Sequence, residues 1–166
     1  MEEHLFIELM KRGENYFKEG RYALASEEFR KALEIDPQNV KALNNYGISL
    51  AEQGLLEHAI EIFQKALKLE PNNEKLGKNL ALAVGNLCSN YIQEGKIEKA
   101  INLSLEIMQL LPLSPLPPSI LGMLYSNQGE KEKAREFLGK AITLCEESEE
   151  YTLLAKLKEE LNNLLT

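Results

Sequence analysis

Apolar residues recur along most of the chain at spacings of three and four, which is typical of helices that bury one face. No segment alternates polar and apolar positions over the length of a strand, so we predict an all-α chain. Glycines punctuate this pattern at intervals of 34, 41 and 34 residues, and each is followed five residues later by alanine. These glycines are Gly20, Gly54, Gly95 and Gly129.

The residues around each glycine suit two antiparallel helices. Glycine accepts the left-handed conformation that ends the first helix, and a small residue seven positions earlier allows a close helix crossing. The small residues are Gly13, Gly47, Cys88 and Gly122. An aromatic residue or leucine stands four positions before each glycine, at Tyr16, Leu50, Tyr91 and Tyr125. Proline closes three of the second helices, at Pro37, Pro71 and Pro112.

This combination resembles the tetratricopeptide repeat family, whose unit is a 34-residue helix–turn–helix. The resemblance covers about residues 5–146 and implies a right-handed α-solenoid in a single domain, residues 1–166. Its units are expected at about residues 5–38, 39–72, 73–113 and 114–147. Three positions depart from the family pattern: Arg12 replaces an apolar residue, Ser104 an aromatic residue and Glu146 the last proline.

The 41-residue interval predicts a lengthened first helix in the third unit. Seven extra residues add about two helical turns and keep the apolar face in phase. We therefore expect one helix from about Glu74 to Gln93, although Gly77 inside it costs about 1 kcal/mol relative to alanine. The extension is either a docking site for a partner or a local extension of the helix without a binding role, and we favour the second.

Helix N-caps are predicted at Asn39, Asn73, Ser114 and Ser148, where a side-chain oxygen precedes a helical pattern. An amphipathic helix is expected over about residues 149–165. Its apolar stripe consists of Leu154, Leu157, Leu161, Leu164 and Leu165. This helix would cap the last repeat, as solenoid ends require, or else pair with another chain. A capped end is expected of a whole protein or of a bounded domain.

The charge and composition exclude several classes of partner. The chain has 19 Lys and Arg against 26 Asp and Glu, a net charge of −7, and no basic block, so nucleic acid is a poor partner. No apolar run approaches the roughly 18 residues of a membrane span. Two cysteines without metal-ligand spacing are typical of packed, reduced thiols, and we predict a cytoplasmic protein.

No motif indicates catalysis, a metal or a cofactor. The only histidines, His4 and His58, have no neighbouring candidate ligand or nucleophile at a recognisable spacing. Adjacent glutamates such as Glu159 and Glu160 diverge by roughly 100° on a helix and do not form an acid–base pair. The glycines are isolated, so none builds a phosphate loop. We predict a protein that is not an enzyme and uses no cofactor.

The family resemblance implies a concave groove, lined by the first helix of each unit, in which partner peptides lie. Counting back from each turn glycine, the groove candidates are Met10, Glu14, Asn45, Ile48, Asn86, Ile92 and Met123. Asparagine suits this role because its amide offers a donor and an acceptor to a peptide backbone. Some family members clamp the acidic tails of heat-shock chaperones, but of the matching positions Met10, Glu14, Asn45, Leu82 and Asn86 only Asn45 fits.

The sequence therefore predicts a non-catalytic scaffold or adaptor that binds a peptide or helix of a partner protein. Chaperone tails are not expected as partners, because the matching positions lack cations. The alternative is a self-assembling module that forms homo-oligomers through the C-terminal helix or the long third-unit helix. An enzyme with an unrecognised site is the remaining class, and no residue pattern supports it.

Overall fold

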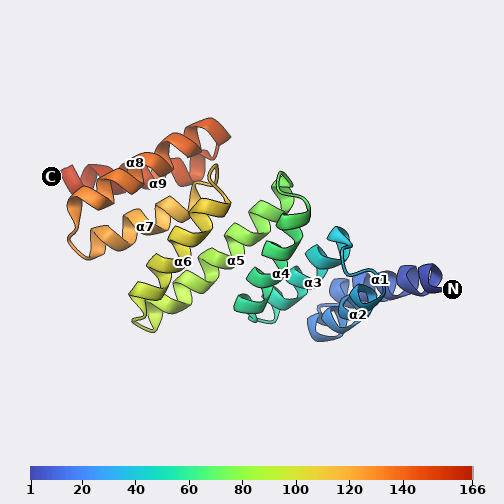
Figure 1. Cartoon of the computed structure of the whole chain (residues 1–166). Helices are drawn as coiled ribbons and strands as arrows, with labels where there is room; N and C mark the ends of the chain where they lie inside the picture. Colours follow the sequence, from blue (N-terminus) through green and yellow to red (C-terminus); the bar gives the residue numbers. More distant parts are fainter. Residues whose placement is uncertain (166) are drawn as a thin grey trace. The chain divides into compact units, whose positions relative to one another are not determined.

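The computed structural model describes residues 1–165, with side chains described to residue 164. Within this range, helices make up all the regular secondary structure (Figure 1). They are α1 (Glu2–Lys18), α2 (Tyr22–Ile35), α3 (Val40–Glu52), α4 (Leu56–Leu69), α5 (Glu74–Gln93), α6 (Ile97–Leu110), α7 (Leu116–Asn127), α8 (Lys131–Ser148) and α9 (Tyr151–Leu165). The prediction of an all-α repeat protein is confirmed.

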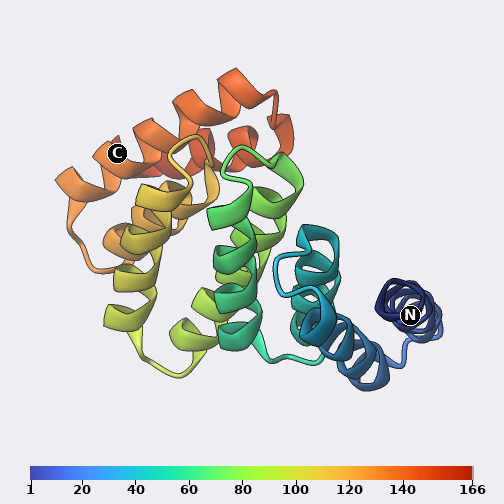
Figure 2. The ribbon, with the colours of Figure 1, turned by 45° about the vertical axis from the view of Figure 1, so that its right-hand side comes forward.

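The helices group into two compact units, Met1–Ala83 and Val84–Thr166, with α5 beginning in the first unit and ending in the second. Within the first unit, α1 pairs with α2 and α3 with α4; within the second, α7 pairs with α8 (Figures 1 and 2). We call α1, α3, α5 and α7 the first helices of the repeats and α2, α4, α6 and α8 the second helices. The single domain over residues 1–166 stays a prediction.

Each repeat reverses direction at its glycine. The φ angles of Gly20, Gly54, Gly95 and Gly129 lie between 72° and 78°, a region that favours glycine because it has no Cβ. The following residue then donates its N–H across the turn, as from Arg21 to the Tyr16 carbonyl at 2.9 Å. The same bond closes the other three turns. The predicted left-handed helix ends are therefore confirmed.

The two helices of a pair touch through a small residue on one helix and a large residue on the other. A Cβ added to Gly13 would stand 2.6 Å from the Phe29 ring, and one added to Gly47 would stand 2.6 Å from the Phe63 ring. The third repeat exchanges the sizes. There Cys88 lies opposite Ser104, with Sγ and Oγ 3.5 Å apart. Ser104 is smaller than the aromatic residue of the family pattern, and Cys88 is larger than the glycine of the other repeats, so the two changes compensate in volume.

Gly122→Ala should destabilise the second unit by about 1–3 kcal/mol, because the new methyl group overpacks the helix contact. An added Cβ would lie 2.7 Å from Leu138 Cδ2 and 3.0 Å from the Leu138 backbone nitrogen. Gly139→Ala is the matched control, since nothing lies within 4 Å of its Cβ position. Urea denaturation of both variants measures the difference. Equal stabilities would show that the close approach carries no energetic weight.

Two of the predicted N-caps and the long helix are found as expected. Asn39 accepts a hydrogen bond from the Ala42 N–H at 3.0 Å, and Asn73 accepts one from the Leu76 N–H at 3.1 Å. The helix that Asn73 caps runs without a break from Glu74 to Gln93. The extra seven residues therefore lengthen a helix and do not form a loop. The predicted N-cap at Ser114 is wrong by one residue, because Pro115 is the N-cap of α7; Ser114 Oγ accepts only a long bond, 3.4 Å, from the Leu116 N–H.

The predicted N-cap at Ser148 is wrong. Ser148 is the last residue of α8, and its hydroxyl donates to the Leu144 carbonyl at 2.8 Å. Glu146 stands where three other repeats have proline, so nothing interrupts the second helix and it continues to Ser148. The chain then turns at Glu149, whose φ is 58°, and α9 begins at Tyr151.

The C-terminal helix α9 packs against α8 within the second unit. Its leucines Leu154, Leu157 and Leu164 are buried with Leu138 and Cys145 of α8, whereas the Leu165 side chain lies outside the described residues. Two polar contacts hold it in place. Ser126 of α7 donates to Glu160 Oε1 at 2.8 Å, and Arg135 of α8 donates to the Leu164 carbonyl at 3.1 Å. The predicted capping of the last repeat is confirmed.

Candidate peptide-binding surfaces

The first-unit candidates lie on α1 and α3, which are neighbouring first helices. Glu14 of α1 forms an ion pair with Lys41 of α3, and Glu14 Oε1 lies 2.8 Å from Lys41 Nζ. The carboxylate of Glu14 is half-buried and the Lys41 side chain is exposed. Because the pair neutralises Glu14, this surface is less acidic than the sequence suggested. Lys41 was missed because nothing along the chain relates it to Glu14.

Asn45 of α3 is held by two other asparagines. Asn79 of α5 donates to Asn44 Oδ1 at 2.7 Å, and Asn44 donates to Asn45 Oδ1 at 3.4 Å. Asn44 is only 6% exposed, so its amide is a fixed link between the two helices. The Asn45 carbonyl oxygen accepts a hydrogen bond in this chain, and its amide nitrogen donates to no other described residue. Asn79 belongs to the extra turns of α5. It follows Asn44 by 35 residues, close to one repeat length, and this spacing is the sequence signal that could have predicted the contact.

The apolar candidates of the first unit differ in exposure. Met10 is 6% exposed and belongs to the core between α1 and α2, so it offers little surface to a ligand. Ile48 is partly exposed on α3. Leu82 of α5, which the sequence singled out only for the chaperone clamp, is 63% exposed. Ile48 and Leu82 therefore supply more accessible apolar surface than Met10.

The second-unit candidates lie on α5 and α7. Asn86 is exposed and makes no side-chain hydrogen bond with another described residue. Ile92 is 40% exposed and Met123 is 43% exposed. The two helices approach each other at Gly85, where an added Cβ would lie 3.3 Å from Leu116. These three side chains are thus accessible on the first helices of the second unit.

The two thiols lie inside the protein and their acidity is shifted. Cys88 and Cys145 are free and buried. Burial raises the pKa of Cys88 despite the opposing hydrogen bond from Ser104, and burial followed by the charges of Glu150 and Glu146 raises the pKa of Cys145. Both thiols are protonated at neutral pH and therefore poor nucleophiles. Among the described residues, no three His, Cys, Asp or Glu side chains gather in a way that could hold a metal ion.

The free energy of unfolding should fall as the pH rises above about 8.5, the ordinary thiol pKa. There the unfolded state has lost thiol protons that the folded state keeps, so alkali favours unfolding until the raised pKa values are passed. The direction follows from the raised pKa of both cysteines. Urea denaturation across this pH range, beside a Cys88→Ala, Cys145→Ala variant, measures the effect. The same slope in both proteins would contradict it.

Within residues 1–165, no helix is long and apolar enough to cross a membrane. The paired helices with glycine turns and small-to-large contacts define a helical repeat protein. Two family models, each described as tetratricopeptide repeat, match residues 10–74 and 120–148, which together exceed half of the chain. The chain belongs to the tetratricopeptide repeat family.

Individual relatives resemble parts of the chain or its fold. Tetratricopeptide repeat protein 14 of Mus musculus is 47% identical over 53 residues, which are 32% of this chain. The chain spans only 7% of the length of that protein. A crystal structure of MamA protein superposes with a TM-score of 0.58 at 23% identity, covering 97% of this chain and 86% of that one.

Two further solved structures have the same fold. MamA 41-end from Desulfovibrio magneticus RS-1 has a TM-score of 0.57 at 19% identity, and covers 97% of this chain and 89% of its own. TTC0263, a thermophilic TPR protein of Thermus thermophilus, has a TM-score of 0.50 at 22% identity, with coverages of 96% and 87%. At these identities the likeness concerns the fold alone.

Proposed function

We propose that this protein is a non-catalytic scaffold or adaptor that binds an extended peptide or an amphipathic helix of a partner protein along its first helices. The observation that carries the proposal is the hydrogen-bonded chain from Asn79 through Asn44 to Asn45. It orients an amide donor on a partly exposed helix face. A donor held in one orientation binds a peptide carbonyl at a lower entropic cost than a freely rotating side chain.

The neighbouring side chains fit the same kind of ligand. Ile48 and Leu82 provide accessible apolar surface in the first unit, and Ile92 and Met123 provide it in the second. A peptide that pairs its backbone with asparagine can place alternate side chains on such surfaces. Because Lys41 is already paired with Glu14, it offers no free cation to an acidic tail, and a neutral or amphipathic segment fits the first unit better.

Asn45→Ala should weaken binding of a selected peptide about tenfold, because a buried peptide carbonyl would lose its donor. The peptide is first selected from a random library against the wild-type chain, and affinities are then measured by calorimetry. Asn79→Ala should weaken binding less, since it removes only the support of Asn44. Asn86→Ala should weaken those peptides that engage the second unit.

Matched controls replace exposed asparagines away from the first-helix faces. Asn72→Ala lies in the turn between α4 and α5, and Asn102→Ala lies on the second helix α6. Both should bind as the wild type does. Selected peptides that bind Asn45→Ala and Asn86→Ala without loss would overturn the proposal, provided that the urea midpoints show both variants to be folded.

Self-assembly is the second candidate, and one contact argues against its C-terminal route. Leu154, Leu157 and Leu164 of α9 are buried against α8 in the same chain, so they are not free to pair with another copy. The long third-unit helix keeps an exposed Leu82 and remains the route to test. We expect the solution mass to stay that of one chain, 18.8 kDa, across a concentration series. A mass that rises with concentration and returns to one chain in Leu82→Glu would instead support self-assembly.

A further inference from the structure

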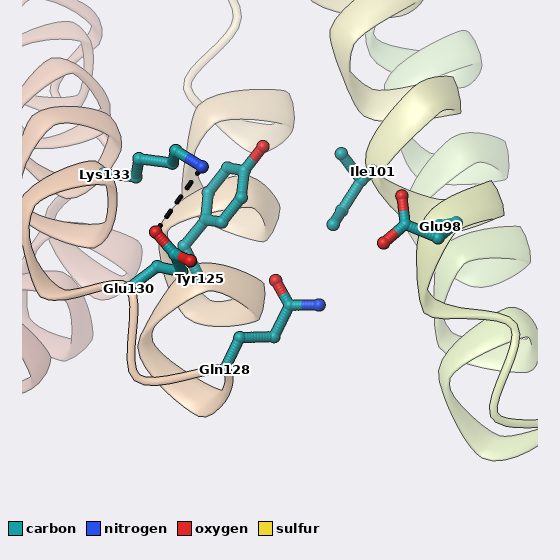
Figure 3. A pocket seen from close by; sticks show the side chains of 6 residues that line it. All are labelled: Glu98, Ile101, Tyr125, Gln128, Glu130 and Lys133. Atoms are coloured by element: carbon teal, nitrogen blue, oxygen red, sulfur yellow. Dashed lines mark ion pairs between the residues drawn. The ribbon is translucent and has the colours of Figure 1, made fainter.

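A pocket of about 510 Å³ lies in the second unit, between the start of α6 and the turn that joins α7 to α8. It is lined by Glu98, Ile101, Tyr125, Gln128, Glu130 and Lys133. In Figure 3, Glu98 and Ile101 of α6 face Gln128 and Tyr125 across the open space. This volume lies within the roughly 300–1,000 Å³ of ligand-binding pockets.

The corresponding place in the first unit is closed by hydrogen bonds. Gln53 precedes Gly54 as Gln128 precedes Gly129, and its Nε2 donates to Ser26 Oγ at 3.0 Å and to the Tyr22 carbonyl at 3.3 Å. Ser26 follows its turn glycine by six residues, as Ile101 does. An isoleucine cannot accept such a bond. Gln128 makes no side-chain hydrogen bond within the described part of the chain, and the space beside it is open.

Of the two carboxylates that line this pocket, Glu130 has a cationic partner among the described residues and Glu98 has none. Glu130 pairs with Lys133, whose Nζ lies 3.5 Å from its carboxylate and 5.1 Å from the centre of the Tyr125 ring. Glu98 is exposed and pairs with no cation among the described residues. Glu98 also stands where the first unit has Ala23, three residues after the turn glycine. The opening therefore combines one unpaired carboxylate with one unpaired carboxamide.

We propose that this pocket binds an arginine side chain of a basic segment in a partner protein. A guanidinium is a planar fork of donors, so it can reach the Glu98 carboxylate and the Gln128 carbonyl together. Its aliphatic stem would lie along Ile101 and the Tyr125 ring, which Phe137 holds by stacking at 5.6 Å. The net charge of −7 favours the approach of a basic segment.

The test is a nuclear magnetic resonance titration of the full chain with the blocked tripeptide Gly-Arg-Gly. We expect saturable shifts at Glu98 and Gln128, and none with the uncharged citrulline analogue. Glu98→Gln should weaken binding about tenfold, the loss expected for a charge-assisted hydrogen bond. Gln128→Ala should weaken it about threefold, because a neutral acceptor contributes less.

Glu132→Gln is the matched control, since Glu132 is exposed in the first turn of α8, as Glu98 is in α6, but does not line the pocket. It should change the affinity less than twofold. Equal losses in Glu98→Gln and Glu132→Gln would overturn the site in favour of general charge attraction. Equal binding of Gly-Lys-Gly would overturn the guanidinium assignment. These results are independent of the asparagine variants, so failure of either proposal is distinguishable.

Discussion

The close approach of two helix backbones is the contact on which three of the four repeats depend. Glycine at position 13, 47 or 122 lets a large side chain of the next helix pack directly against the backbone. This contact sets how the second helix lies on the first, and the turn glycine makes the short connection sterically allowed. Since the second helix covers one side of the first, the opposite side is left for other contacts. Met10 is buried against the second helix, whereas Asn45, Ile48, Asn86, Ile92 and Met123 stay accessible.

The lengthened α5 shows how an insertion acquires a role in a neighbouring repeat. Its extra turns continue the helix, and they also bring Asn79 within 2.7 Å of Asn44 on α3. Asn44 is buried, and a buried amide is costly unless its polar atoms are paired. The extension therefore satisfies a polar group inside the first unit and, through it, orients Asn45. The inserted residues of α5 thus help to position Asn45, a candidate binding residue.

Equivalent positions of different repeats need not have equivalent surfaces. Ser26 and Ile101 occupy the same place, yet only the serine can accept the hydrogen bond from a glutamine of the next repeat. One closes the junction and the other leaves an open pocket. Both repeats keep the turn glycine with a positive φ, Gly20 and Gly95, so the helix pair forms with either residue. Surface chemistry can thus vary from repeat to repeat while the fold stays the same.

Local signals in the sequence were sufficient for the helices, the left-handed glycines, the Asn39 and Asn73 caps and the long α5, because each depends on residues within a few positions of one another. The same locality explains the error at Ser148, since a serine followed by glutamates suits the end of one helix as well as the start of the next. Burial of Met10, the Glu14–Lys41 pair and the Asn79–Asn44–Asn45 chain were decided by tertiary structure alone. They depend on how each helix is rotated against its neighbours, which the packing of many side chains determines together.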